Sequence, residues 1–275
     1  MRKELFQDTI DNTSLALHFR DVASSTSKLK AGFSTRYNGV SKDPYASLNL
    51  GFHVPDHPLD VLTNRKILSK SIGTHLEDWV VGEQIHGNEI ARIGSNDIGR
   101  GATDHDTAIP NKDGLYTDER GIMLAALYAD CVPLFFYSPS SERVGIAHAG
   151  WKGTTKDIAG EMIRKWQEDG IDPKDILIAI GPSIGSCCYE VDDRVIASVI
   201  QVAFESKQFF TPNNNHTYQL DLKAVNKHLF LKAGVLEDNI FVSDYCTSCS
   251  NLFFSHRSEN GKTGRMMGYI GLEEV

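Results

Sequence analysis

A hairpin-like stretch in the middle of the chain, YADCVPLFFYSPSSERVGIAHAGWKG, constrains the fold more than any other. Residues 132–137 are apolar and strand-forming, residues 138–141 are typical of a turn, and residues 144–147 form a second short apolar run. This order predicts a β-hairpin. The open ends of a hairpin lie together, so we expect Cys131 and His148 to be neighbours. Two short strands give no structural reason to place a thiol beside an imidazole, and the pair therefore indicates a functional site.

Hydrophobic periodicity along the rest of the chain alternates between strand and helix patterns, which predicts an α/β fold. We expect strands at 15–19, 31–35, 79–81, 121–127, 176–180, 240–242 and 252–255, and helices at 56–73, 154–168, 192–204 and 220–233. Thr154 or Thr155 is the expected cap of the second helix, and the polar stretch 95–113 is expected to be a loop or lid. Because the chain shows no repeat and no low-complexity linker, we predict a single domain over residues 1–275.

The charge balance bears on the class of partner. The chain carries a net charge of −8 and has no run of lysine and arginine. This makes nucleic acid or an anionic membrane an unsuitable main partner. An anionic small molecule remains compatible, because a few convergent cations can bind it inside an acidic protein.

The cellular compartment is predicted from the start of the chain and from its cysteines. Basic residues at the start are not followed by an apolar run, and no uninterrupted apolar segment reaches membrane-spanning length. The five cysteines are an odd number. We therefore expect a cytoplasmic protein, without a membrane partner, whose thiols are reduced.

Three short motifs, QIHG, ADC and AHAGW, each follow a predicted strand and contain His86, Cys131 and His148. One thiolate and two imidazoles suit zinc, and three protein ligands leave a fourth position for water, as in catalytic zinc sites. A cysteine nucleophile is the rival use of the same residues, with His86 or His148 as the base. The nucleophile needs one histidine and a free thiol, whereas the metal site needs both histidines.

Cationic residues follow two of the predicted strands. Residues 150–155 open a predicted helix, whose free N–H groups together with Lys152 favour an anion. Arg257 and Arg265 follow the predicted strand at 252–255 and are further candidates for holding an anion. Solvated surface positions are the alternative for all three side chains.

The remaining cysteines form two local pairs, Cys187-Cys188 and Cys246-x-x-Cys249. They suggest a second zinc site or a redox pair. Adjacent cysteines seldom bind one metal together, and no histidine lies at zinc-finger spacing from the C-x-x-C pair. We therefore expect these four residues to be buried, reduced thiols.

Nine stretches together resemble the YfiH/YlmD family, which includes the mammalian laccase-domain-containing protein, and the resemblance is strongest to the bacterial YlmD branch. The stretches are FSTRYNGVS, SLNLGFHV, QIHGNEI, DGLYTD, YADCVPLFFY, IAHAGWKGT, IGPSIGSCCYEV, LDLKAVN and FFSHRSENGKTGR, and they run in order from about Phe33 to Arg265. The resemblance implies an αββα layered sandwich with mixed sheets and a zinc ion held by His86, Cys131 and His148. The family often has arginine where this chain has Lys152, which keeps the charge but not the two-pronged donor.

Two functional names accompany this resemblance. One is multicopper polyphenol oxidase, or laccase. The other is a purine nucleoside enzyme, which carries out phosphorolysis of adenosine, inosine, guanosine and S-methyl-5′-thioadenosine and deaminates adenosine. A multicopper oxidase needs roughly ten histidines around its coppers and a cysteine flanked by histidine. This chain has ten scattered histidines, and Cys131 lies between Asp130 and Val132. We therefore expect a purine nucleoside enzyme with zinc, and retain copper as the alternative metal.

Further residues are assigned by the mechanism that the resemblance implies. Phosphate would be held by Lys152, Arg36, Arg257 or Arg265, and Asn49 would contact either the ribose or a metal-ligand side chain. The base would stack on Tyr116 or Phe52, and Asp130 would carry a proton, orient a ligand or simply cap a turn. The partners would be purine nucleosides and phosphate, with the chain acting as a monomer or homodimer. Three alternatives stay open: a phenol oxidase, a cysteine or zinc amidase acting on a cell-wall precursor, and a non-enzymatic metal-binding partner protein.

Overall fold

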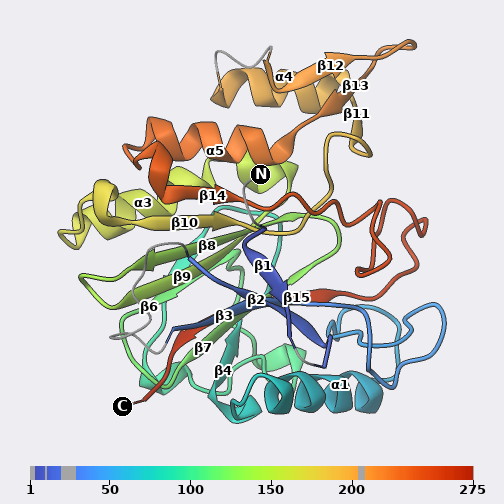
Figure 1. The fold of residues 1–275 in the computed structure, drawn as a ribbon, viewed down its shortest axis with the longest axis vertical. Helices are drawn as coiled ribbons and strands as arrows, with labels where there is room; N and C mark the ends of the chain where they lie inside the picture. The colour runs from blue at the N-terminus through green and yellow to red at the C-terminus, as the bar shows by residue number, and fades with distance from the viewer. Residues whose placement is uncertain (1–3, 10, 20–28, 204–207, 275) are drawn as a thin grey trace.

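The computed structural model describes residues 4–9, 11–19, 29–203 and 208–274. Its main body has four layers, in the order helix, sheet, sheet, helices, with a small third sheet and one more helix beyond the last layer (Figure 1). This is the αββα arrangement with mixed sheets that the family resemblance implies.

The first large sheet has six strands and runs in the order β1, β2, β3, β15, β7, β4. Their bounds are β1 Phe6–Asp8, β2 Ser14–Leu17, β3 Leu29–Ser34, β15 Met266–Leu272, β7 Met123–Tyr128 and β4 Trp79–Val81. The pair β4 and β7 is parallel, and the other neighbours are antiparallel. At the centre, Gly268 of β15 lies opposite both Phe33 and Ala126.

The second large sheet also has six strands, in the order β14, β10, β8, β9, β6, β5. Their bounds are β14 Ile240–Val242, β10 Leu177–Ile180, β8 Val132–Ser138, β9 Arg143–Ala149, β6 Gly114–Thr117 and β5 Ile90–Arg92. Strands β8 and β9 form the predicted hairpin, with Val132 opposite Ala149 at its open end. The hairpin is confirmed, and it lies at the centre of the sheet.

The helices cover the outer faces of the two sheets, and a third sheet follows β10. The helices are α1 Pro58–Ser71, α2 Trp151–Thr155, α3 Ile158–Glu168, α4 Asp193–Val202 and α5 Leu222–Lys232, and the third sheet contains β11 Glu190–Asp192, β12 Phe210–Pro212 and β13 Thr217–Leu220. Short 3₁₀ turns occur at Leu76–Asp78, Ser95–Asp97, His105–Thr107, Pro173–Asp175 and Glu237–Asn239. None of the helices in the described part of the chain is long and apolar enough to cross a membrane.

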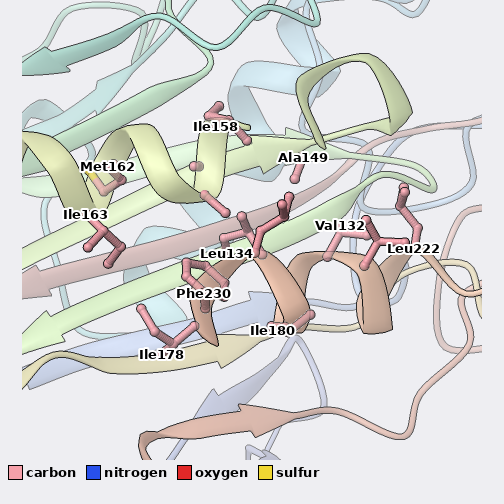
Figure 2. Close-up of a cluster of buried hydrophobic side chains, with 14 of the residues drawn as sticks. Val132, Leu134, Ala149, Ile158, Met162, Ile163, Ile178, Ile180, Leu222 and Phe230 are labelled. Carbon is pink, nitrogen blue, oxygen red and sulfur yellow. The ribbon is translucent and has the colours of Figure 1, made fainter. Parts of the chain in front are cut away.

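An apolar core lies between each pair of neighbouring layers, three cores in all. Both faces of each central strand are therefore buried. On β7, alternate residues divide between two cores: Met123, Ala125 and Leu127 pack on the α1 side, whereas Leu124, Ala126 and Tyr128 face the second sheet. On β8, Leu134 and Phe136 face the helices, while Phe135 and Tyr137 face the first sheet. Figure 2 shows the core between the second sheet and helices α3 and α5. The uninterrupted apolar runs in the sequence therefore reflect strands covered on both sides.

Two sequence predictions are wrong in detail. Residues 252–255 form no strand; they lie in a turn region, and Phe253 and Phe254 are buried without strand pairing. The predicted helix at 154–168 is two helices, because Asp157 takes a left-handed conformation (φ 59°) between α2 and α3. Asp157, not Thr154 or Thr155, caps α3 by accepting a hydrogen bond from the Gly160 N–H.

Other differences are smaller. Strand β15 was not predicted, although it completes the first sheet. The predicted helix at 192–204 corresponds to α4, and its last residue, Phe204, lies outside the described residues. The stretch 95–113 is irregular apart from two short 3₁₀ turns, as expected for a long loop.

Candidate metal centre

A cavity of about 680 Å³ opens where several chain segments meet at one end of the sheets. That volume lies within the range of pockets for small organic molecules. Half of the ten histidines line it, together with the segments that follow β4, β7 and β9. The five are His53, His86, His105, His148 and His256.

The three residues predicted as metal ligands come together in the wall of this cavity. The ligand atoms of His86, Cys131 and His148 all lie within 4.8 Å of one another. The two imidazole centroids are 4.8 Å apart, with the rings nearly perpendicular. The hairpin register explains why Cys131 lies beside His148: Cys131 immediately precedes β8, and His148 is the next-to-last residue of β9.

A buried carboxylate, Asp113, fixes one of the imidazoles. The Nδ1 atom of His148 lies 2.9 Å from Oδ1 of Asp113, and the main-chain N–H of His148 also donates to the Asp113 carbonyl. Because Nδ1 is engaged, Nε2 is the ring nitrogen left for a metal. Carboxylate partners of this kind orient a histidine ligand and make it more basic.

The same carboxylate holds the turn that carries the second histidine. Asp113 accepts hydrogen bonds from three consecutive N–H groups, those of Ile85, His86 and Gly87, at 3.1, 3.0 and 2.7 Å. His86 has a positive φ of 60°, which is strained for a residue other than glycine. The three hydrogen bonds stabilise this conformation, so Asp113 positions two of the three candidate ligands.

Sequence reasoning missed the role of Asp113 and placed it only at the end of a polar loop. The signal was an Asp-Gly pair directly before an apolar strand, in the DGLYTD motif. Strand β6 begins at Gly114 and pairs with β9, with Gly114 opposite Ala147. That register sets Asp113 beside His148, but it is a long-range pairing that the sequence does not reveal.

A glycine provides the space that the cluster needs. A Cβ atom on Gly150 would lie 2.8 Å from Sγ of Cys131 and 3.2 Å from Cδ2 of His86. Contacts below 3.0 Å require atoms to move. The glycine after β9 therefore allows the thiol and the imidazole to approach the backbone closely.

The electrostatics of the cluster favour a thiolate. Burial acts to raise the pKa of the Cys131 thiol, but His148 and His86 beside it lower that pKa to about 6. Burial acts to lower the pKa of His148, but the Cys131 thiolate and Asp113 raise it to about 9. Burial also acts to raise the pKa of Asp113, and its hydrogen bonds hold that pKa below the ordinary value. Since the thiolate is the metal-binding form of cysteine, Cys131 is available as a ligand at neutral pH.

Three of the predicted anion-binding residues line the same cavity. They are Lys152, Arg257 and Arg265. Arg265 uses Nη1 to donate to the carbonyls of Thr263 and Gly264. In the described part of the chain, none of the three cations forms an ion pair with a carboxylate. Their charges are therefore available to an anionic ligand.

The short helix at Lys152 corrects one part of the sequence argument. The sequence predicts that residues 150–155 open the helix at 154–168 and that the dipole of this helix favours an anion. Helix α2 has only five residues, and the chain turns before α3 begins at Ile158. The aligned peptide dipoles that would attract an anion are correspondingly few. The ammonium group of Lys152, rather than the helix end, is the cationic feature of this segment.

Other predicted substrate contacts lie outside the cavity lining. Arg36 forms an ion pair with Glu259 at 3.0 Å and donates to the Ala46 carbonyl. Asn49 is fully buried, and its Oδ1 accepts the Arg265 N–H, so it supports a lining residue.

The aromatic side chains also differ from those that the mechanism would use. Neither Tyr116 nor Phe52 is among the lining residues. Tyr116 is buried, and the Phe52 ring lies 4.3 Å from the guanidinium carbon of Arg65. The aromatic rings that do line the cavity are Trp151 and Tyr189.

Asp130 lies in the cavity wall next to Cys131, but both of its carboxylate oxygens have protein partners. Oδ1 accepts from the Thr247 hydroxyl at 2.7 Å, and Oδ2 accepts from the Arg257 main-chain N–H at 2.9 Å. These contacts join the end of β7 to two later loops. Of the roles considered for Asp130, orientation of neighbouring groups fits these contacts best.

His53 is a lining residue that sequence reasoning did not single out. Burial, and then the charge of Arg265, lower the pKa of His53 to about 4. Its imidazole is therefore neutral at neutral pH and can accept a hydrogen bond. The SLNLGFHV motif contained this residue, but nothing in the spacing of the motif indicated its direction.

Comparison with known proteins agrees with the motifs. Residues 30–273 match a family described as multi-copper polyphenol oxidoreductase laccase. The chain is 49% identical over 247 residues to a protein named purine nucleoside phosphorylase YlmD from Geobacillus stearothermophilus, covering 89% of this chain and 90% of the relative. The chain belongs to the YfiH/YlmD family. The predicted resemblance is confirmed.

Solved structures of the YfiH/YlmD family share the fold. The crystal structure of YlmD from Geobacillus stearothermophilus matches with a TM-score of 0.93 at 46% identity, over 99% of this chain and all of the other. A Bacillus licheniformis hypothetical protein named YfiH matches with a TM-score of 0.91 at 44% identity, over 95% and 97% of the two chains. The names attached to this family conflict, since one describes a copper oxidase and the other a phosphorylase.

Proposed function

We propose that this protein is a zinc-dependent purine nucleoside phosphorylase that also deaminates adenosine. Its substrates would be adenosine, inosine, guanosine and S-methyl-5′-thioadenosine. The observation that carries the proposal is a three-ligand His–Cys–His cluster in the wall of a cavity, which also presents three cations that form no ion pair within the described residues. Relatives named purine nucleoside phosphorylase support the reaction class.

The donor set fits zinc. His86, Cys131 and His148 would hold the ion, and the Asp113 carboxylate would fix His148 so that Nε2 faces it. Bound there with an open position, zinc would supply a Lewis acid and a water of lowered pKa.

For phosphorolysis, a phosphate oxygen forms a bond to C1′ of the ribose while the bond from C1′ to the purine nitrogen breaks. We propose that Lys152, Arg257 and Arg265 neutralise and position the phosphate, since all three line the cavity. Trp151 and Tyr189 offer flat apolar faces for the base. The neutral imidazole of His53 can accept a hydrogen bond from the sugar or the base.

For deamination, water adds to C6 of adenine and ammonia leaves, giving inosine. Asp130 is our candidate for an assisting group in either reaction. Because both of its oxygens are engaged by Thr247 and Arg257, we assign it a positioning role on the loop that carries Arg257.

The copper oxidase reading is weaker on structural grounds. A multicopper oxidase requires several histidine-rich copper sites. Among the described residues, one group of potential metal ligands contains histidine, and that group holds two imidazoles. Such a cluster accounts for one metal ion.

A cysteine hydrolase is the second candidate, and one observation favours it. Cys131, His148 and Asp113 are arranged in the order thiol, imidazole, carboxylate, with His148 Nδ1 on Asp113 at 2.9 Å. This is the geometry of a nucleophile, base and orienting group. An amidase acting on a cell-wall precursor would use this set and would not need His86 as a ligand.

The test combines metal analysis with a nucleoside assay on the wild type, Cys131→Ala and His86→Ala. His75→Ala, an exposed histidine outside the cavity lining, is the matched control. We expect phosphate-dependent release of base from adenosine in the wild type and the control, and loss of both this activity and the cavity zinc in the other two variants. Copper in several equivalents without base release would overturn the proposal. Amide hydrolysis that survives His86→Ala would establish the hydrolase instead.

The organisation of the molecule completes the proposal. We propose that residues 1–275 act as one domain, because β15 pairs with β3 and β7 and so joins distant parts of the chain. The site is built from one chain, which is compatible with a monomer or a homodimer. A cytoplasmic location suits both the reduced thiols and nucleoside substrates.

A further inference from the structure

We propose that Cys187, Cys188, Cys246 and Cys249 form a second zinc site, which is structural and which fixes one wall of the cavity. The sequence predicts buried, separate thiols at these positions, and the structure contradicts that prediction. Cys187 and Cys249 are exposed, the other two are half-buried, and all four sulfur atoms lie within 4.8 Å of one another.

The separations suit a single tetrahedral ion. The Sγ atom of Cys249 lies 3.4 Å from that of Cys187 and 3.2 Å from that of Cys188. Four thiolates around one zinc, with bonds of about 2.3 Å, have sulfurs about 3.8 Å apart. The cluster needs only small adjustments to reach that geometry. An iron–sulfur cluster is larger and spreads its cysteines farther apart.

Two loops meet to build this cluster, and their backbone pairing sets the approach. Ser183 and Cys246 form an isolated parallel β-bridge, and the Thr247 N–H donates to the Ser183 carbonyl at 3.0 Å. The Gly185 N–H donates to Sγ of Cys246 at 3.2 Å. Donation from a backbone amide to sulfur favours a thiolate, the form that binds metal.

A tight turn explains how two adjacent cysteines contribute to one site. The N–H groups of Cys188 and Tyr189 both donate to the Gly185 carbonyl at 3.0 Å, so the chain curls at this point. A Cβ atom on Gly185 would lie 3.3 Å from Sγ of Cys187 and 3.5 Å from Sγ of Cys246. The turn and the glycine together bring both sulfurs to the side of the C-x-x-C loop.

The chemistry of the position argues for a bound ion. Four free thiols gathered at the surface would gain little from burial and would be prone to oxidation. A set of four sulfurs is the usual ligand set of a structural zinc, and it leaves no open position for a substrate. Within the described part of the chain, none of these four residues lines the cavity.

The cluster is nonetheless connected to the cavity through its two loops. Ile184 and Tyr189, on the first loop, are lining residues. The Arg257 guanidinium donates to the Cys188 carbonyl at 3.1 Å, and Thr247, inside the C-x-x-C loop, donates to Asp130. An ion that joins the two loops would therefore fix the Cys188 carbonyl, which binds Arg257, and the Thr247 hydroxyl, which binds Asp130.

Disulfide formation is the alternative use of four adjacent thiols. It would oxidise the cysteines in pairs, with the loss of two hydrogens for each bond, and would exclude the metal. The two outcomes differ in mass and in metal content, so one experiment separates them.

The experiment counts zinc per chain by elemental analysis and native mass spectrometry, on protein purified without added metal. We expect about two zinc ions in the wild type, about one in Cys249→Ser, about one in Cys131→Ala, and none in the double variant. Ser186→Ala, which alters an exposed neighbour of Cys187 without removing sulfur, should keep two. A zinc content that does not fall in Cys249→Ser, iron in place of zinc in this cluster, or paired disulfides would overturn the proposal.

Two further measurements protect the test against a variant that simply misfolds. Cys249→His should retain two zinc ions, because three cysteines and one histidine also form a structural zinc site. Cobalt substitution should give strong sulfur-to-metal charge-transfer absorption that falls sharply in Cys249→Ser, since the four-sulfur site contributes most of the thiolates. Loss of cobalt absorption equal to that of Cys131→Ala would contradict the assignment.

The expected effect of the second zinc on phosphate binding in the cavity rests on the proposed function. It is measured by enzyme kinetics, separately from the zinc count. In Cys249→Ser we expect the KM for phosphate to rise several-fold, with a smaller change in kcat, because Arg257 loses its support. Zinc counts would remain valid if no nucleoside were turned over. A second zinc without any change in KM would keep the metal site but would overturn its role in the cavity wall.

Discussion

The two cysteine-containing clusters of this protein differ in almost every respect that decides what a metal site does. The first combines one sulfur with two imidazoles, lies in a cavity wall, and has the buried Asp113 behind it. The second has four sulfurs, lies partly exposed between two loops, and has the Gly185 N–H donating to the sulfur of Cys246. Three ligands leave a position for a substrate, and four do not.

The contacts that support the ligands differ between the two clusters in a way that matches the role proposed for each. In the first cluster a carboxylate both orients His148 and holds the turn of His86. Such support fixes ligands while leaving one side open. In the second cluster the support comes from the chain pairing of Ser183 with Cys246. There the proposed ion and the loops stabilise each other, and no separate orienting side chain is needed.

Removal of metal should separate the clusters most strongly. A chelator can enter the open position of the first cluster, whereas the second is closed by its own sulfurs. We expect brief treatment to remove one zinc and nearly all phosphorolysis, and added zinc to restore both. The measurement is zinc content and activity against time. Loss of both ions at the same rate would remove the distinction between an open and a closed site.

Asp113→Asn should weaken only the first cluster. The amide keeps one acceptor oxygen but loses the charge that supports His148 and the turn at His86. We expect about 10–100-fold weaker zinc binding at the first site and unchanged binding at the second, measured by competition with a chromophoric chelator. Asp106→Asn, at an exposed position, is the control. Equal weakening of both sites would show that the effect is general destabilisation.

The pH dependence should sharpen the comparison further. Between pH 6 and 9, Cys131 is a thiolate and His148 carries a proton that zinc must displace. Zinc affinity of the first cluster should therefore rise about tenfold per pH unit in this range, and more steeply below pH 6, where Cys131 is also protonated. Calorimetry of Cys249→Ser in buffers of different ionisation enthalpy measures the proton released. Binding without proton release near pH 8 would contradict this expectation.

The smallest predicted difference concerns the glycine beside each cluster. Alanine at position 150 would place its Cβ 2.8 Å from a sulfur, whereas alanine at 185 would lie at 3.3 Å. We expect Gly150→Ala to weaken zinc binding at the first cluster by about fivefold, which corresponds to about 1 kcal/mol. Gly185→Ala should change the second by less. The reverse order in chelator competition would show that the second cluster is the more tightly packed.

The sequence predicted the fold class and the proximity of Cys131 to His148 because both rest on local patterns. Apolar runs and turn residues define the β8–β9 hairpin, and the hairpin alone brings Cys131 to His148. The central strands of both large sheets are buried on two faces, so they appear in the sequence as uninterrupted apolar runs.

The parts that were missed depend on contacts between distant segments. Asp113 acquires its role when β6 pairs with β9, and the second cluster forms when the loop at Ser183 meets the loop at Cys246. The Phe253–Phe254 segment resembles a strand because it is apolar, yet its burial comes from packing and not from pairing. Periodicity in one segment contains no information about which other segment it will meet.

The position of β15 has a consequence for how the protein folds. Among the strands of the described residues this one comes last in the sequence, yet it lies between β3 and β7 at the centre of the first sheet. Until it arrives, β3 and β7 both present an unpaired edge, and such edges are prone to association with other chains. High contact order of this kind slows folding. During synthesis, the first sheet and the adjoining Arg265 can be completed only after β15 has left the ribosome, so nascent chains would depend on protection from aggregation until then.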